Sequence, residues 1–240
     1  MCLLCIKPTR REVLGGALVL PLSLGTPRHG LLEPVLRLAP SPPPGRVAVT
    51  LDACPGHFDP RIATVLVAHK IPATIFITSI WMKWNPQGLA YFLAHPEIFA
   101  LENHGAKHLP PVLGTTPVYG LPVAGSLDAI RTEVLDGAAS IQSATGKRPT
   151  WYRGAAGLYS PQAIPLIESL GFKIAGYSLN SDQGASLPAA TVAKRIEAAR
   201  DGDVIEGHIN QPKRASGAGI ATGVMALQAK GMAFATLGAA

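Results

Sequence analysis

Two histidines four positions apart are the first residues in this chain whose type and spacing suggest chemistry. His104 and His108 stand in the run Asn103-His104-Gly105-Ala106-Lys107-His108. Neutral imidazoles bind zinc and similar divalent metals, and a bound metal lowers the pKa of a coordinated water to about 7. A lone loop histidine is more often a hydrogen-bonded structural residue. The pair therefore indicates a metal site only if other polar residues are positioned to join it.

Further polar residues fall at or after the ends of short apolar segments, as a set of six: Asp52, His104, His108, Arg153, Asp182 and His208. Strands are predicted at 46–52, 73–78, 98–102, 150–153, 173–179, 203–207 and 233–237. Helical patterns separate them, opened by such caps as Asp59-Pro60, Ser126 and Ser160-Pro161. This alternation predicts a parallel sheet, and the carboxyl ends of its strands meet where active sites form. The pattern predicts an enzyme of the α/β class.

Composition restricts the class of protein. The chain has 240 residues, 48% of them hydrophobic and 15% charged, which suits one compact domain of barrel size. Residues 1–39 carry five basic and two acidic side chains, so the net charge of +6 falls to +3 in the remainder. Because no basic run is interleaved with aromatic residues, nucleic acid is not an expected partner. The oligomeric state is left open.

The beginning of the chain resembles an export signal of the twin-arginine type. Arg10 and Arg11 precede an apolar run at 13–24 that is shorter than the roughly 20 residues of a membrane span. An ordinary secretory signal or a retained surface helix is the alternative. We expect an exported protein, periplasmic or extracellular, with no stable membrane span after processing. The proline-rich stretch 40–44 suggests a division into signal and linker at 1–39 and a domain at 40–240.

Five segments resemble, in family order, the motifs of NodB-homology polysaccharide deacetylases, which form carbohydrate esterase family four. They are Thr50-Leu51-Asp52-Ala53-Cys54-Pro55, the His104 segment ending in Leu109-Pro110, Trp151-Tyr152-Arg153-Gly154-Ala155-Ala156-Gly157, Tyr177-Ser178-Leu179-Asn180-Ser181-Asp182 and Ile205-Glu206-Gly207-His208. The resemblance implies an irregular (β/α) barrel of about seven parallel strands. It also implies a metal-dependent hydrolase that removes acetyl groups from N-acetylated sugars of a cell-envelope or extracellular glycan. The expected metal is zinc, with cobalt, nickel or manganese as alternatives.

Motif position also implies roles for single residues. Asp52 corresponds to the general base and His208 to the general acid, while His104 and His108 correspond to metal ligands. Arg153 is expected to hold the Asp52 carboxylate, with Asp182 orienting Arg153; a structural ion pair at the barrel rim is the alternative reading of Arg153 and Asp182.

Substrate contacts come from the third motif and the residues after it. The backbone N–H of Ala156 corresponds to an oxyanion-hole donor. Tyr152 and Tyr159 are the candidates for stacking on a sugar, because Ala155 and Ala156 replace the usual proline and aromatic residue.

The clearest departure from the family is Ala53, which stands where a metal-binding aspartate is usual. Asp52 serving as both ligand and base is the preferred interpretation, followed by waters completing the metal shell, and then by loss of activity. Cys54 is a further candidate ligand, because residues two apart on a strand share a face. Glu206 replaces a usual leucine. A non-catalytic carbohydrate-binding protein and a hydrolase of non-sugar amides remain alternative functions.

Overall fold

The computed structural model describes residues 23–24 and 30–237. The expected export signal lies outside the described residues, apart from the last two positions of its apolar run. Within these ranges, no helix combines the length and the apolar character needed to cross a bilayer.

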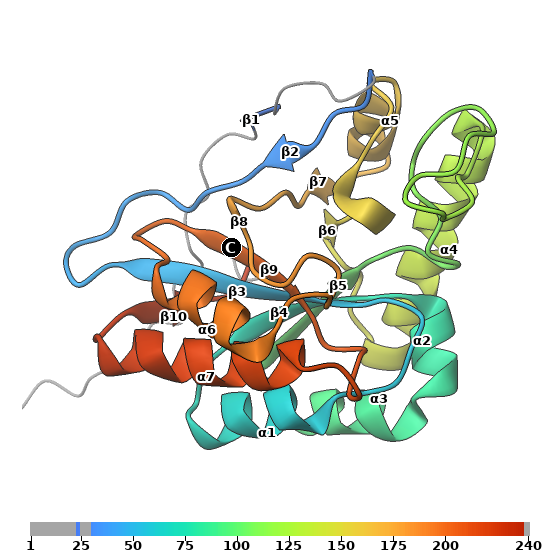
Figure 1. The fold of residues 1–240 in the computed structure, drawn as a ribbon. Coiled ribbons are helices and arrows are strands. Elements are labelled where there is room, and N and C mark those ends of the chain that lie inside the picture. Colours follow the sequence, from blue (N-terminus) through green and yellow to red (C-terminus); the bar gives the residue numbers. More distant parts are fainter. Residues whose placement is uncertain (1–22, 25–29, 238–240) are drawn as a thin grey trace, which may run out of the picture.

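A curled sheet of seven parallel strands, in the order β7-β6-β5-β4-β3-β9-β8, forms the framework (Figure 1). The strands are β3 (Arg46–Ala53), β4 (Ala73–Ile77), β5 (Phe99–Asn103), β6 (Trp151–Tyr152), β7 (Lys173–Ile174), β8 (Leu179–Asn180) and β9 (Val204–His208), and β10 (Ala233–Ala235) pairs in parallel with the start of β3. The expected irregular α/β barrel is therefore confirmed, and four central strands lie close to their predicted positions.

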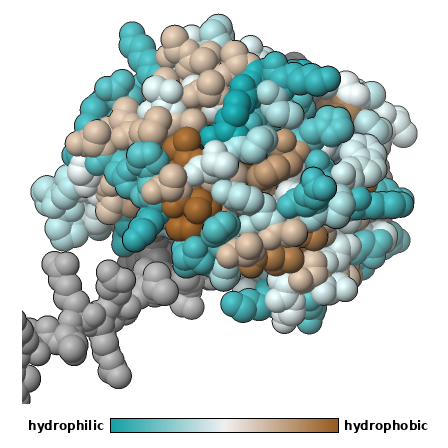
Figure 2. All heavy atoms as spheres, turned by 90° about the horizontal axis from the view of Figure 1, so that it is seen from below, coloured by the Kyte–Doolittle hydropathy of each residue, from teal (hydrophilic) through white to brown (hydrophobic). Residues whose placement is uncertain are grey.

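Helices cover the outer face of this sheet and connect its strands (Figure 1). They are α1 (Pro60–Ala68), α2 (Ser79–Trp84), α3 (Pro86–Leu93), α4 (Leu127–Thr145), α5 (Ala163–Ser169), α6 (Ala189–Glu197) and α7 (Ser216–Ala229). Two of the three predicted caps are present: the side chain of Asp59 accepts the Arg61 N–H, and that of Ser126 accepts the Ala129 N–H. The cap predicted at Ser160 is wrong, because α5 begins later and the Ser160 hydroxyl accepts the Leu113 N–H instead. Seen from below, the helical face shows apolar patches separated by polar side chains (Figure 2).

The predicted strand 173–179 is wrong, because the structure has two short strands in its place. β7 and β8 lie at opposite edges of the sheet, and only residues 175–178 join them. At one end of this crossing Ala175 N–H donates to Tyr152, and at the other Ser178 N–H donates to Val204. So short a connection holds the two edges close together, which curls the sheet into a barrel.

The segment before residue 40 belongs to the packed unit and is not only a linker. Leu36 and Leu38 are buried against Trp151 and Val204, beside the crossing between the sheet edges. Next to them, β1 (Ser23–Leu24) pairs antiparallel with β2 (Pro34–Val35). A side chain at Gly176 would collide with the Pro34 carbonyl, which shows how closely the two segments approach. The packed unit therefore begins before the expected boundary at residue 40.

Strand β3 separates two kinds of environment. Val49, Leu51 and Ala53 pack into the large apolar cluster between sheet and helices. Thr50 and Asp52 alternate with them and face the inside of the barrel, as the period of two requires. The side chains that follow Ala53 at the carboxyl end thus sit where the barrel opens.

Candidate active site

The carboxyl ends of β3, β5, β6 and β9 bring the predicted polar residues to one end of the barrel. Strand register pairs Asp52 with His208, and the Asn103 that precedes His104 with Tyr152, next to Arg153. Asp52, His104, Arg153 and Asp182 are all buried, and His208 is partly exposed. All six polar residues singled out in the sequence therefore lie in one neighbourhood.

Asp52 is held as a buried carboxylate by Arg153. Arg153 donates from Nη1 to Asp52 Oδ1 at 2.8 Å, and from Nε and Nη2 to the carbonyls of Ala175 and Gly176 at 3.2 and 3.1 Å. Its guanidinium also lies 4.3 Å from the centre of the Phe76 ring. Burial alone would raise the pKa of Asp52, but Arg153, followed by His104 and His208, outweighs it and lowers that pKa. The carboxylate is thus ionised and fixed in direction, as a general base requires.

The expected pairing of Asp182 with Arg153 is wrong. Asp182 accepts the backbone N–H of His208 at its Oδ2 and lies 2.9 Å from His208 Nδ1 through its Oδ1. The donors of Arg153 are instead taken by Asp52 and by carbonyls of the β7–β8 crossing. The reason is the strand order: β8 lies beside β9, so Asp182, two residues after β8, lies next to His208 at the end of β9.

His208 faces a second carboxylate, Glu206. Oε1 of Glu206 lies 3.2 Å from His208 Nδ1, and its Oε2 has no hydrogen-bond partner within the described part of the chain. Burial lowers the pKa of His208, but Glu206 and Asp182 outweigh it and raise that pKa well above 6.5. Burial raises the pKa of Glu206 itself to about 8, although His208 opposes the shift. Because the carboxylates engage Nδ1, Nε2 is the nitrogen of a protonated His208 that can deliver a proton.

His104 and His108 lie together with Cys54. His104 Nδ1 is 2.7 Å from the Arg153 carbonyl, which can only accept, so Nδ1 carries the hydrogen and Nε2 offers its lone pair. Nε2 lies 3.4 Å from Cys54 Sγ and 3.7 Å from Asp52 Oδ2. The ring centres of His104 and His108 are 5.0 Å apart.

This arrangement fits a divalent metal. One ligand atom each from Cys54, His104 and His108 lies within 4.8 Å of the other two. Imidazole and thiolate are common zinc ligands, and a histidine ligand ordinarily donates its other N–H to a carbonyl or carboxylate. Asp52, the expected third ligand, lies beside this group with one oxygen engaged by Arg153.

Glu133, which the sequence analysis missed, holds the loop that carries His108. Its carboxylate accepts the N–H groups of Lys107 and Leu109, and α4 approaches so closely that a side chain at Gly137 would collide with Asn103. The available signal was a charged residue on the apolar face of a predicted helix, next to Val134. A buried carboxylate in such a position usually has a structural partner.

The two tyrosines expected to touch the sugar do not face the cleft. Tyr152 is 0% exposed and Tyr159 is 1% exposed. Both pack in the cluster beside α4 and α5, and the Tyr159 hydroxyl accepts the Gly154 N–H at 2.6 Å. A ring without an accessible face cannot stack on a sugar, so this expectation is wrong. Ala156, only partly buried, lies in the short helical turn that follows Arg153, with φ of 63°.

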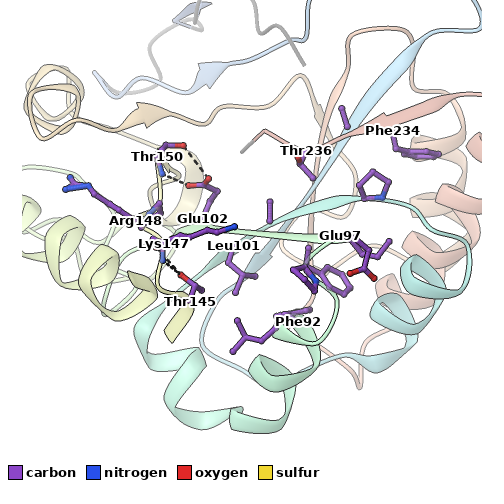
Figure 3. A pocket seen from close by; sticks show the side chains of 18 of the residues that line it. Phe92, Glu97, Leu101, Glu102, Thr145, Lys147, Arg148, Thr150, Phe234 and Thr236 are labelled. Carbon is purple, nitrogen blue, oxygen red and sulfur yellow. Dashed lines mark hydrogen bonds between the residues drawn. The ribbon is translucent and has the colours of Figure 1, made fainter. Parts of the chain in front are cut away.

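A separate hollow of about 620 Å³ lies near the other end of the sheet and includes none of the predicted site residues. Figure 3 shows Glu102 in it, turned toward Thr150. The Oε2 atom of Glu102 accepts the N–H groups of Thr150 and Trp151, both at 2.8 Å. Burial raises the pKa of Glu102 to about 7 despite these bonds.

Residues 39–175, more than half of the chain, match the family described as polysaccharide deacetylase. Among curated protein sequences, none matches. Three solved structures share the fold at low sequence identity. The peptidoglycan deacetylase PdaC from Bacillus subtilis is 21% identical with a TM-score of 0.66, over 82% of this chain and 90% of that one.

A family 4 acetyl xylan esterase from Clostridium thermocellum, in complex with a cobalt ion, is 22% identical with a TM-score of 0.64, over 80% of this chain and 88% of that one. A CE4 family pseudoenzyme from Bacillus anthracis is 17% identical with a TM-score of 0.65, over 82% of this chain. The match covers 65% of the pseudoenzyme, so this chain spans just under two thirds of its length. The barrel, the motifs in their order and the family match agree, and the chain belongs to the polysaccharide deacetylase family, carbohydrate esterase family four.

Proposed function

We propose that this protein is a metal-dependent hydrolase that removes acetyl groups from N-acetylated sugars of a cell-envelope or extracellular glycan. Membership of the family supports hydrolysis of acetyl groups on polysaccharides. The observation that carries the proposal is the position of Asp52: an ionised carboxylate fixed by Arg153, with the imidazole of His104 on one side and that of His208 on the other.

His104 and His108 would hold the metal, and zinc is the expected ion. From the sequence, Asp52 is the expected third ligand. When bound, the metal supplies an activated water and polarises the acetyl carbonyl. Asp52 takes the proton of the attacking water, and Arg153 keeps this carboxylate ionised and oriented.

His208 donates a proton from Nε2 to the departing amine nitrogen, and Asp182 fixes the ring by its two contacts. The backbone N–H of Ala156 is proposed to stabilise the developing oxyanion.

Acetate release by the purified full chain tests this proposal. Acetylated chitooligosaccharide, peptidoglycan and acetylated xylan should be compared with small amides, before and after chelation and return of zinc. We expect release from an N-acetylated glycan that Asp52→Asn removes and that His57→Ala, an exposed loop variant, leaves intact. Release only from small amides would favour the non-sugar alternative.

A second candidate function is carbohydrate binding without catalysis. Ala53, where a metal-binding aspartate is usual, is the observation that favours it, and one structural neighbour is described as a pseudoenzyme. A folded protein that binds chitooligosaccharide but releases no acetate with zinc, cobalt, nickel or manganese would establish this function instead.

Export to the periplasm or the extracellular space is part of the proposal and rests on the arginine pair at residues 10 and 11. Cell fractionation tests it. We expect Arg10→Lys/Arg11→Lys to retain the protein in the cytoplasm, whereas unchanged export would contradict a twin-arginine signal.

A further inference from the structure

Cys54 follows directly after Ala53, the residue that replaces the family's metal-binding aspartate. We propose that the Cys54 thiolate takes over the role of that carboxylate and completes a cysteine–histidine–histidine metal site with His104 and His108. This inference rests on the proposed metal dependence and adds a ligand that the family pattern does not supply.

Strand geometry explains why position 54 can replace position 53. Ala53 is fully buried in the apolar cluster on the helix side of β3. Cys54 lies on the same face as Asp52, and its sulfur contacts His104. Of the two neighbouring positions 53 and 54, only position 54 therefore faces the two imidazoles.

The distances suit a tetrahedral ion. Zinc bonds of about 2.3 Å to sulfur and about 2.0–2.1 Å to nitrogen place the two ligand atoms roughly 3.5 Å apart at a tetrahedral angle. The separation of Cys54 Sγ and His104 Nε2 is 3.4 Å. The Arg153 carbonyl holds the His104 ring by its Nδ1, and Glu133 holds the backbone on both sides of His108, so the first ring and the loop that carries the second are positioned before an ion arrives.

A thiolate ligand also separates two duties that would otherwise fall on one residue. Asp52 uses one oxygen for Arg153, and its other oxygen lies 3.7 Å from His104 Nε2. With Cys54 as third ligand, Asp52 remains available as the base. The softer sulfur donor favours zinc and cobalt over manganese and magnesium.

Cobalt(II) titration of the full chain tests the ligand directly, in a Cys2→Ser/Cys5→Ser background so that Cys54 is the sole thiol. We expect about one equivalent of cobalt and a thiolate-to-cobalt charge-transfer band in the near ultraviolet. Cys54→Ala should lose the band and weaken binding at least about tenfold. Cys54→Asp should regain binding without the band, and His69→Ala, an exposed histidine on the helical side, should leave both unchanged.

The 3.4 Å between Cys54 Sγ and His104 Nε2 would also suit a hydrogen bond between thiol and imidazole. The cobalt titration distinguishes this hydrogen bond from a shared metal. Cobalt binding of equal strength in wild type and Cys54→Ala, with no band, overturns the inference while leaving a metal-dependent hydrolase intact. A wild type that shows the band but releases no acetate from any glycan supports the Cys54 ligand and defeats the hydrolase. Acetate release that survives chelation but requires Cys54 would overturn the ligand role in favour of a sulfur nucleophile.

Discussion

His104 and His208 are both histidines at the carboxyl end of a parallel strand, yet their surroundings are opposite. The Nδ1 atom of His104 meets a neutral carbonyl, and the negative groups, Asp52 and Cys54, lie on its Nε2 side. For His208 the carboxylates of Asp182 and Glu206 lie on the Nδ1 side. His104 is fully buried and His208 is slightly exposed, but the side on which the charge is placed is the larger difference between them.

This difference assigns different chemistry to each ring. Burial lowers the pKa of His104, but Asp52 and Cys54 outweigh it and raise that pKa to about 9. The negative charge of Asp52 and Cys54 that favours a proton on His104 Nε2 would equally favour a metal cation at this nitrogen. At His208 the charge stabilises an imidazolium whose Nε2 is directed elsewhere, as a general acid requires. In the proposed function, the first ring is therefore suited to bind a metal and the second to donate a proton.

The largest expected effects come from removing either ring. His208→Ala should lower kcat for acetate release by about 10²–10⁴-fold, because the leaving amine loses its proton donor. His104→Ala should cause a comparable loss by a different route, the loss of the metal. Metal analysis beside the kinetics separates the two variants. Loss of metal in His208→Ala would contradict the distinction between His104 as a metal ligand and His208 as a proton donor.

Asp182→Asn should produce the next largest effect, a fall in kcat of about 10²-fold. The amide is neutral and has one acceptor oxygen for the two His208 donors, so the pKa of His208 falls and the alkaline limb of the pH–rate profile moves to lower pH. Metal content should stay at the wild-type level. A variant with normal kcat and an unmoved profile would show that Asp182 only supports the loop.

Glu206→Leu should act in the same direction but more weakly, at less than about tenfold in kcat near pH 7. Glu206 is charged mainly above its own pKa of about 8, so its removal lowers the pKa of His208 chiefly in that range, and activity is lost at lower pH than in the wild type on the alkaline side of the profile. The pH–rate profile is the measurement, with Glu206→Gln as the variant that keeps the shape of the side chain. A shift toward higher pH would contradict the role given to Glu206.

Glu102→Gln tests a buried carboxylate that bonds to the backbone of Thr150 and Trp151 and to neither ring, and it should change stability with no effect on kcat. The pKa of Glu102 is raised to about 7, so its stabilising contribution is complete below the unfolded pKa near 4.5 and is lost as the pH rises through 7. Glutamine can keep both backbone bonds, which reach a single oxygen. We expect the variant to be more stable than the wild type at pH 8 by on the order of 2 kcal/mol, with little difference at pH 4.

Urea unfolding at the two pH values measures this change. A variant that is less stable than the wild type at pH 8 would show that Glu102 is held as a carboxylate. Glu102 would then be ionised like Asp52, although its two short bonds come from backbone N–H groups and not from a charged partner such as Arg153, which keeps Asp52 ionised.

Much of the barrel and the membership of the site were predictable from the sequence. Continuous apolar runs located β3, β4, β5 and β9, because strands buried on both faces are apolar throughout. The division of 173–179 was not predictable, because residues 175–178, which form the crossing, include no proline, asparagine or aspartate to mark a turn. The burial of Tyr152 and Tyr159 escaped prediction for a related reason: aromatic rings suit a sugar platform and a core equally well.

The sequence by itself determined which residues end the strands, and therefore that Asp52, His104, Arg153 and His208 share one end of the barrel. Only the tertiary structure decided which residues are in contact. Asp182 holds His208 and leaves Arg153 to Asp52 and two backbone carbonyls, and Cys54 reaches the two imidazoles while Ala53 turns into the core. The physical reason is that strand order and the direction of each side chain arise from packing between segments far apart in the chain. Local spacing gives the alternation of faces along one strand, as for Ala53 and Cys54, but it does not give the partners on other segments.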